Sequence, residues 1–446
     1  MFTEVLRLVR TDLTATWLSW TAVAVTLLVS ATGAAFSLAV LITGEQDSAE
    51  LGGTILGFAL IGIIAAVTTT TGLVINERRR TYARWKLLGL PGPGVFLAVM
   101  LQVAVISVVA TVPGALLAVP IVPPAADYLA TQGAPVGQPT VTLEVTLMVC
   151  LAAALCGAAG RALSVARVRP VAALRDAVVP KARPGVTATL VGLFFVVGLV
   201  ALITSEDLSE DGAVVGAQLV LLMAMVPLTG WFLPLILQWT RVLHVFGTSA
   251  RAAADNVRIR TAFTSAQVLP WFLVAGAVVG IGSPIMVMMR VEGGEISDIG
   301  IMVVLFAPAV APPLVAGLSS VLVMRPRRRR DEAVLHRAGA SGWQRRMVGW
   351  WESAAVVVSA GILTLGYTVY GLVLTNHVYF GTAWPANWRQ DILWGPLAVI
   401  LAAMWLLLAG VLGASRPAIG HTSRDSRTVR PAGQERAEST GRMVRV

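Results

Sequence analysis

The stretch INERRRTYARWKLLGLPGPGVFLAVMLQVAVI, residues 75–106, decides the fold, because a second version of it occurs later in the chain. That version is MRPRRRRDEAVLHRAGASGWQRRMVGWWESAAVV, residues 324–357. Each version follows a long apolar run, begins with a cluster of arginines, continues as a short helical piece, turns at a glycine and enters a new apolar run. This layout predicts a basic elbow between two membrane-spanning helices in each half of the chain.

Placing Gly89 on Gly339, a shift of 250 residues, aligns the two versions. The same shift aligns Arg78, Arg79 and Arg80 with Arg328, Arg329 and Arg330, Gln102 with Glu352, and upstream Val9-Arg10-Thr11 with Ile259-Arg260-Thr261. We interpret the pattern as an internal duplication. The alternative is that two membrane loops of similar composition share their arginines because of topology alone.

The composition indicates a membrane protein. Of the 446 residues, 56% are hydrophobic and 13% are charged, and the mean hydropathy is +0.77. Apolar runs of about 20 residues, long enough to cross a bilayer as a helix, recur along the chain. We therefore expect an all-α polytopic membrane protein with about ten transmembrane helices, over residues 20–43, 52–75, 95–119, 141–160, 186–204, 213–237, 267–289, 299–324, 348–374 and 392–413.

These spans suggest a 4+2+4 arrangement. We expect a first four-helix unit over residues 1–180, two linking helices over 181–245, a second four-helix unit over 246–419 and a disordered polar tail over 420–446. Because six helices separate equivalent points, the two units would point the same way through the membrane, as a parallel repeat. Residues 1–19 predict an amphipathic helix, which either lies at the membrane surface or simply extends the first span.

The net charge of +10 is explained by topology, so we expect no nucleic-acid partner. With the N-terminus inside and ten spans, every lysine and arginine except Arg290 and Arg389 falls on one side. Basic loops stay cytoplasmic, so both termini are expected in the cytoplasm. Arginine far outnumbers lysine, which hints at a GC-rich bacterial genome and hence at the bacterial plasma membrane.

The two elbows are the candidate functional sites. On a helical wheel Trp85 and Leu88 share an arc with Leu335 and Ala338, while the basic residues occupy another arc. Gly89 and Gly339 would end the short helices as C-terminal caps, and Ser341 would cap the next helix. The arginines have two interpretations: charges that only fix topology, or a docking surface. The docking candidates are Glu77, Arg78, Arg79, Arg80, Trp85, Leu88 and Gly89, and Arg328, Arg329, Arg330, Leu335 and Gly339.

The sequence contains no GxxxxGK[ST] phosphate loop and no HExxH motif, so we expect neither an ATPase site nor a metal site in this chain. Glu352 is the one carboxylate near the interior of a span, and an intramembrane charge is by default a functional candidate. The structural alternative, which we favour, is that Glu352 pairs with Arg345, Arg346 or a neighbouring elbow, or faces the headgroups.

The second elbow, RRRRDEAVLHRAGASGWQRRMVGWWES, resembles the conserved elbow of FtsX-like permeases, the membrane subunits of MacB-type ABC transporters. There an arginine-rich start, a hydrophobic helix, an Ala-Gly-Ala-Ser turn and a glutamate in the next span occur in this order. ERRRTYARWKLLGLPGPG looks like the same motif with Pro91 for the serine and Gln102 for the glutamate. ARVRPVAALR, residues 166–175, is similar to the tail that closes such a domain.

The resemblance implies a ten-span permease without a nucleotide site of its own. Two copies of a separate ATPase, which hold ATP and Mg, would bind the elbows around Glu77–Gly89 and Arg327–Gly339. Outer loops are short here, unlike those of many relatives, so a substrate would meet the spans and would be hydrophobic or amphipathic, such as a lipid, peptide or drug. The alternatives are a non-transporting membrane regulator driven by an ABC ATPase and an ion-coupled secondary transporter.

Overall fold

The computed structural model describes residues 2–15, 17–43, 46–131, 139–167, 186–204, 211–291, 299–382 and 388–413. Within these ranges the regular structure is helical and contains no strand. The expected tail, 420–446, and the segment 168–185 lie outside the described residues. The helices are α1 Phe2–Ala15, α2 Trp17–Thr43, α3 Gln46–Glu77, α4 Arg79–Leu87, α5 Gly92–Thr131, α6 Leu143–Ala166, α8 Val186–Thr204, α9 Asp211–Ile236, the 3-10 helix η2 Leu237–Phe246, α10 Thr248–Ile259, α11 Thr261–Ala275, the π-helix η3 Gly276–Ile281, α12 Gly282–Val291, α13 Ile299–Arg337, α14 Gly342–Phe380, α15 Trp388–Asp391 and α16 Trp394–Gly413.

Among the described residues, seven helical segments are long and apolar enough to cross a membrane. They are Trp20–Ile42, Ile55–Glu77, Gly92–Thr131, Leu143–Ala166, Val214–Phe246, Phe263–Val291 and Gly342–Phe380. Three of the ten expected spans coincide instead with shorter apolar segments among the described residues, Ala188–Thr204, Phe306–Val321 and Trp394–Gly410. The expected all-helical fold is therefore confirmed in the part of the chain that the structure describes, with seven candidate membrane spans there, and the expected total of ten spans stays a prediction.

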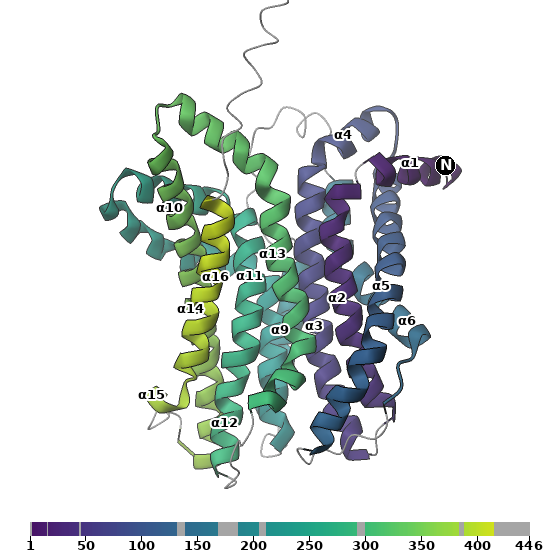
Figure 1. Cartoon of the computed structure of the whole chain (residues 1–446), viewed down its shortest axis with the longest axis vertical. Coiled ribbons are helices and arrows are strands. Elements are labelled where there is room, and N and C mark those ends of the chain that lie inside the picture. Colours follow the sequence, from purple (N-terminus) through teal and green to yellow (C-terminus); the bar gives the residue numbers. More distant parts are fainter. Residues whose placement is uncertain are drawn as a thin grey trace, which may run out of the picture.

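The long helices form two neighbouring bundles (Figure 1). In the first, α2 packs against α3, α5 and α6, and α6 also contacts α3 and α5. In the second, α11 packs against α13, α14 and α16, and α16 also contacts α13 and α14. The pairs of neighbours thus correspond helix by helix, with α2, α3, α5 and α6 matching α11, α13, α14 and α16.

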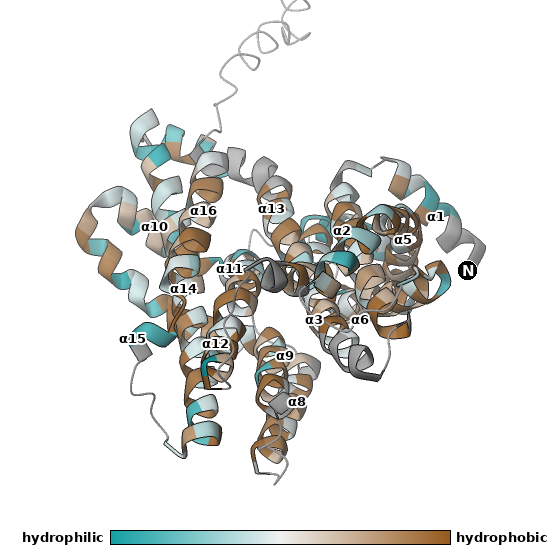
Figure 2. Cartoon of the chain, turned by 60° about the horizontal axis from the view of Figure 1, so that its bottom comes forward, coloured by the Kyte–Doolittle hydropathy of each residue, from teal (hydrophilic) through white to brown (hydrophobic). Residues whose placement is uncertain are grey.

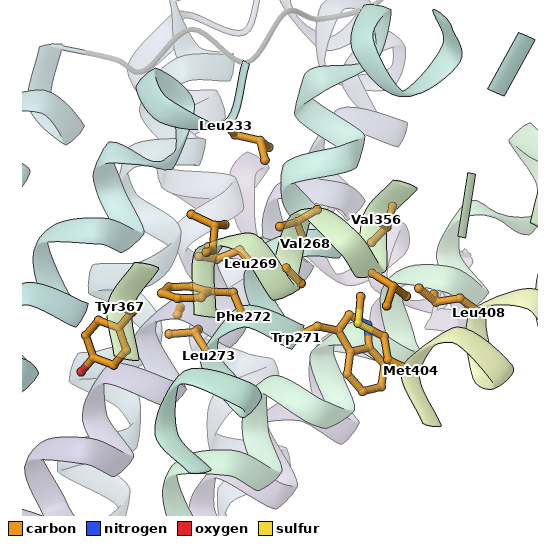
Figure 3. Close-up of a cluster of buried hydrophobic side chains, with 14 of the residues drawn as sticks. Leu233, Val268, Leu269, Trp271, Phe272, Leu273, Val356, Tyr367, Met404 and Leu408 are labelled. Atoms are coloured by element: carbon orange, nitrogen blue, oxygen red, sulfur yellow. The ribbon is translucent and has the colours of Figure 1, made fainter. Parts of the chain in front are cut away.

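Helices α8 and α9, between the two bundles in sequence, pack on each other. Helix α9 also packs against α11 and α14 of the second bundle. Figure 2 shows that the residues of α8 and α9 are mostly hydrophobic, whereas hydrophilic residues occur at α1, α10 and α15. Figure 3 shows the core that joins α9 to the second bundle: Leu233 of α9 lies with Trp271 and Phe272 of α11, Tyr367 of α14 and Met404 of α16.

The two bundles meet where α13 lies against α2 and α3. Glycines permit this close approach: a Cβ added to Gly62 of α3 would lie 2.6 Å from the carbonyl oxygen of Ala309, and one added to Gly33 of α2 would lie 3.1 Å from the Cα of Pro308. Phe58 and Phe306 close the contact edge to face, with ring centroids 5.7 Å apart. Without a hydrophobic driving force in lipid, such backbone proximity is a main source of helix association.

Replacing Gly62 by alanine should therefore destabilise the protein. The added methyl group has no room against the Ala309 carbonyl, and overpacking of this kind costs about 1–3 kcal/mol. We expect a lower midpoint of thermal unfolding for the purified full chain. Gly57→Ala on the same helix is the matched control, because a Cβ there meets nothing within 4 Å. Equal midpoints for the two variants would contradict the tight contact.

Candidate functional site

The first elbow, residues 77–92, joins α3 to α5. The helix is interrupted at Arg78, and α4 follows it. Gly89 adopts φ +97°, a conformation that favours glycine. Its amide donates to the carbonyl of Lys86 (3.1 Å), and the amide of Leu90 donates to that of Trp85 (3.0 Å). These two bonds are the Schellman pattern of a helix C-terminus, so the expected cap at Gly89 is confirmed.

The second elbow, residues 327–342, ends in the same way. Here α13 runs without interruption to Arg337, and Gly339 adopts φ +85°. The amide of Gly339 donates to the carbonyl of His336, and the amide of Ala340 to that of Leu335, both at 3.0 Å. Each of these residues lies 250 positions after its counterpart in the first elbow, so the alignment made from sequence also holds for the backbone hydrogen bonds.

The helices after the turns also begin at equivalent positions, Gly92 and Gly342. Ser341 forms a capping box: its hydroxyl accepts from the amide of Gln344 (3.2 Å), whose side chain accepts from the amide of Ser341 (2.9 Å). The expected Ser341 cap is confirmed. In the first elbow Pro91 occupies this place, and its carbonyl accepts from the amide of Val95.

Helix α4 is anchored by aromatic burial. Tyr82 and Trp85 are buried and pack edge to face, with centroids 5.2 Å apart. Leu88, expected on the same arc as Trp85, is instead 86% exposed, because it follows the last residue of α4 and the turn directs it away. Lys86 donates to the carbonyl of Ala166 at the end of α6 (2.6 Å), a favourable place for a cation. Burial lowers the pKa of this ammonium group.

A buried ion pair joins the first elbow to the N-terminal helix. Arg78 is only 6% exposed, and its guanidinium pairs with Asp12 of α1. The other terminal nitrogen has no hydrogen-bond partner among the described residues, but the group lies over the ring of Tyr82, 5.7 Å from the centroid. The Tyr82 ring therefore stabilises the Arg78 guanidinium by a cation–π interaction, in addition to the ion pair with Asp12.

Asp12 also connects the elbow to the next span. Its second carboxylate oxygen accepts from the amide of Gln102 in α5 (2.7 Å), and Gln102 is completely buried. The Tyr82 hydroxyl donates to the same Gln102 at 3.4 Å. Burial raises the pKa of Tyr82 far above neutrality, so the phenol keeps its proton and can act as the donor. We call this three-helix contact between α1, α4 and α5 the first joint.

The second half has an equivalent joint with the charges exchanged. Arg260, between α10 and α11, pairs with Asp331 of the second elbow. Asn256 of α10 donates to Glu352 of α14 at 2.9 Å. Hydrogen bonding to Asp331 raises the pKa of Arg260 against the opposing effect of burial, with smaller contributions from the charges of Asp331 and Glu352. The helix before the bundle therefore supplies the acid in the first joint and the base in the second.

Glu352 accepts a hydrogen bond from Asn256 of α10, at 2.9 Å. Arg345 and Arg346, which we also considered as partners, lie on the same helix as Glu352, α14. Glu352 aligns with Gln102, and each reaches the helix that precedes its own bundle. Gln102 and Glu352 therefore have the same role, a hydrogen bond to the preceding helix, which either an amide or a carboxylate can form.

The other candidate residues are distributed unevenly. Glu77 ends α3 and is exposed, Arg79 is half-buried and Arg80 is exposed, as are both turn glycines. Leu335 is half-buried. Arg328, Arg329 and Arg330 lie in α13, but their side chains are outside the described residues. In the part of the chain that the structure describes, no three His, Cys, Asp or Glu residues gather as metal ligands.

Both elbows lie at the same end of the molecule. In Figure 1, α4 and the C-terminal part of α13 reach the end at which α1 lies across the bundle. Of the two placements left open for residues 1–19, the structure shows a separate helix, α1, in place of an extension of α2.

The comparisons with known proteins identify part of the chain. Residues 53–170 match the family model described as FtsX-like permease C-terminal. The matched segment is thus similar to the C-terminal part of FtsX-like permeases. It contains most of α3, the complete first elbow, α5 and α6. No curated protein matches the chain. The FtsX-like domain and the seven apolar helices support a multi-pass membrane protein of the ABC-permease type.

Sequence reasoning missed several of the side chains that hold the two elbows in place. Asp12 and Asn256 lie outside the proposed elbows, and Tyr82 and Asp331 lie inside them but were not singled out, although each of the four contributes to a joint. One signal was available: Asp12 is an acid in a basic lead-in, and Asp331 directly follows the run of arginines. Which basic residue each acid meets depends on helices that are distant in sequence.

The first joint can be tested by exchanging its charges. Asp12→Ala leaves Arg78 buried without a counter-charge, a change that typically costs about 3–5 kcal/mol, so the thermal unfolding midpoint should fall sharply. The double variant Asp12→Arg with Arg78→Asp should be more stable than either single change. It gives the first joint the polarity of the second, and the Gln102 amide can donate or accept. Additive losses in this double-mutant cycle would show that the two side chains are not coupled.

Proposed function

We propose that the chain is the permease subunit of an ABC transporter, built from two FtsX-like units in a 4+2+4 arrangement. The observation that carries the proposal is the family match over residues 53–170, because the matched segment contains the first elbow. The second elbow has the same pair of turn hydrogen bonds at positions shifted by 250, which supports a second unit of the same kind. The corresponding helix contacts in the two bundles support the parallel repeat.

In this proposal each elbow binds one copy of a separate ATPase, and ATP and Mg are held by that partner, so the permease itself catalyses no reaction. The exposed part of each elbow combines charge with apolar surface. The first offers Arg80, Arg84 and the 86% exposed Leu88, and the second offers Val334, which is 56% exposed. Exposed apolar side chains that are surrounded by positive charges are typical of a surface that binds another protein.

The joints would pass movement from the elbows to the spans. An elbow displaced by the ATPase cannot leave its neighbours without separating the buried Arg78–Asp12 pair or the Arg260–Asp331 pair. Each joint also holds the first part of the following long helix, through Gln102 in α5 or Glu352 in α14. The movement would therefore reach α1 or α10 and the next span together.

We further propose export or extraction of a hydrophobic or amphipathic molecule, such as a lipid, peptide or drug. The exposed surface of α8 is apolar, with Phe194 and Val197 among its most exposed residues. Such a surface supports a path on which a hydrophobic substrate moves along the lipid-facing side of the helices. We place the protein in the bacterial plasma membrane with both termini in the cytoplasm. This orientation puts α1, α4 and α10 on the side where ATP is available.

Docking of the ATPase at the elbows can be measured by co-purification. Leu88→Glu and Val334→Glu change exposed side chains, so they should preserve folding while each weakens capture of the ATPase by about tenfold, and the double variant should lose it. Leu143→Glu is the matched control: Leu143 is 42% exposed and begins α6, at the end opposite to the Lys86 contact. Full capture by the double variant would refute docking at these surfaces.

Glu352 provides a test of the ABC mechanism against ion coupling. Glu352→Gln places at this position the amide found at Gln102, and its oxygen can still accept from Asn256. Transport by the complex with its ATPase should therefore stay within about twofold of wild type and keep the same pH profile, whereas Glu352→Leu should reduce it. Loss of transport in the glutamine variant, together with an altered pH profile, would indicate that Glu352 carries a proton.

A further inference from the structure

A cavity of about 330 Å³ lies between η2 and α10, beside the second joint, whose Arg260 stands between the lining residues Ile259 and Thr261. Its apolar wall comes from Pro234, Leu237 and Ile259, and its polar groups come from Gln238, Asp255, Arg258 and Thr261. The volume is at the lower end of the range for small-molecule sites. In Figure 1, α10 lies on the far side of the molecule from α1 and α4.

The cavity presents one negative and one positive group that do not neutralise each other. Asp255 and Arg258 are one helical turn apart on α10, where side chains are close neighbours, and both line the cavity. Among the described residues they do not form an ion pair with one another. Asp255 instead meets His244 at 3.3 Å, and Arg258 reaches only the amide oxygen of Gln238, at 3.4 Å.

The surroundings are those of a membrane–water boundary. Three of the lining residues, Pro234, Leu237 and Gln238, belong to the C-terminal part of the apolar segment Val214–Phe246. Other large apolar side chains of α9 and η2 are exposed: Leu235 by 71%, Val242 by 60% and Val245 by 84%. A helix that exposes apolar residues next to charged ones lies with its apolar face in the headgroup and acyl boundary. The cavity would thus open toward lipid headgroups.

We infer that this cavity binds the headgroup of a zwitterionic phospholipid with a primary ammonium group, that is, phosphatidylethanolamine. Arg258 would bind the phosphate, for which a guanidinium is well suited, and Asp255 would accept hydrogen bonds from the ammonium group. The acyl chains would lie along the exposed apolar side chains of α9 and η2. The Gln238 amide adds a second donor for the phosphate.

The lining also distinguishes this headgroup from its competitors. A trimethylammonium group has no N–H to donate and is typically held by aromatic rings, and none of the residues that line the cavity is aromatic. A headgroup with a phosphate but no cation would leave Asp255 close to an anion, which is unfavourable. Phosphatidylcholine and phosphatidylglycerol should therefore bind less well than phosphatidylethanolamine.

The experiment measures lipid binding to the purified full chain by native mass spectrometry, with each of the three phospholipids added in turn to the detergent-solubilised protein. Wild type should retain phosphatidylethanolamine about tenfold more tightly than the other two. Arg258→Gln should weaken both phosphatidylethanolamine and phosphatidylglycerol. Asp255→Asn should weaken phosphatidylethanolamine about tenfold and leave phosphatidylglycerol equal or tighter, a pattern that general destabilisation does not produce.

The controls are Arg251→Gln, an exposed arginine of α10 outside the cavity lining, and Asp127→Asn, an exposed acid of α5. Both should bind like wild type. Glycerophosphoethanolamine, the soluble headgroup, should compete only at much higher concentration if the acyl chains contribute. Equal affinity of wild type for the three lipids, or equal losses in the control and cavity variants, would overturn the inference. Because no ATPase is present, this result is independent of the proposed transport function.

Discussion

The buried pair between Arg78 and Asp12 is the constraint on which the arrangement of the first half depends. A guanidinium that is 6% exposed is tolerated only when a counter-charge and hydrogen bonds replace its water. The carboxylate that meets it comes from α1, so α1 must lie across the end of the bundle and cannot continue the axis of α2. The same carboxylate binds Gln102, which fixes α5 against the elbow. One side chain thereby determines the relative positions of three helices.

In the second half an ion pair also joins the elbow to the segment before the bundle, with the acid and the base exchanged. The two pairs differ in how far water reaches them. Arg260 and Asp331 are about one-third exposed, so their pair is partly screened by water, unlike the pair in the first joint. The first elbow also buries Tyr82 and Trp85, whereas Val334 in the second is mostly exposed. The first elbow is thus held against its bundle by buried aromatic side chains, whereas the second continues α13 as a helical extension.

Several features could be predicted from sequence because local chemistry determines them. A glycine after a short amphipathic helix predicts the positive φ at Gly89 and Gly339, and serine followed by Gln344 predicts the capping box. The ion pair of the first joint and the hydrogen bond of the second could not be predicted, because Asp12 and Arg78 are 66 residues apart and Asn256 and Glu352 are 96 apart. Closeness in sequence pointed to Arg345 and Arg346 as partners of Glu352. The hydrogen bond from Asn256 depends on the packing of α10 against α14, which local sequence does not reveal.

The contact of α13 with α2 and α3 links the two halves more strongly than a repeat of independent units requires. The second elbow is the end of α13, so a displacement of that elbow moves a helix that also packs on the first bundle. Gly62 leaves no gap at this contact, since even a Cβ would meet the Ala309 carbonyl. Closely packed interiors transmit displacements because they cannot be compressed to absorb them. If the elbows are driven by two ATPase copies, their movements therefore cannot be independent: the second elbow acts on both bundles, and the first acts chiefly on its own.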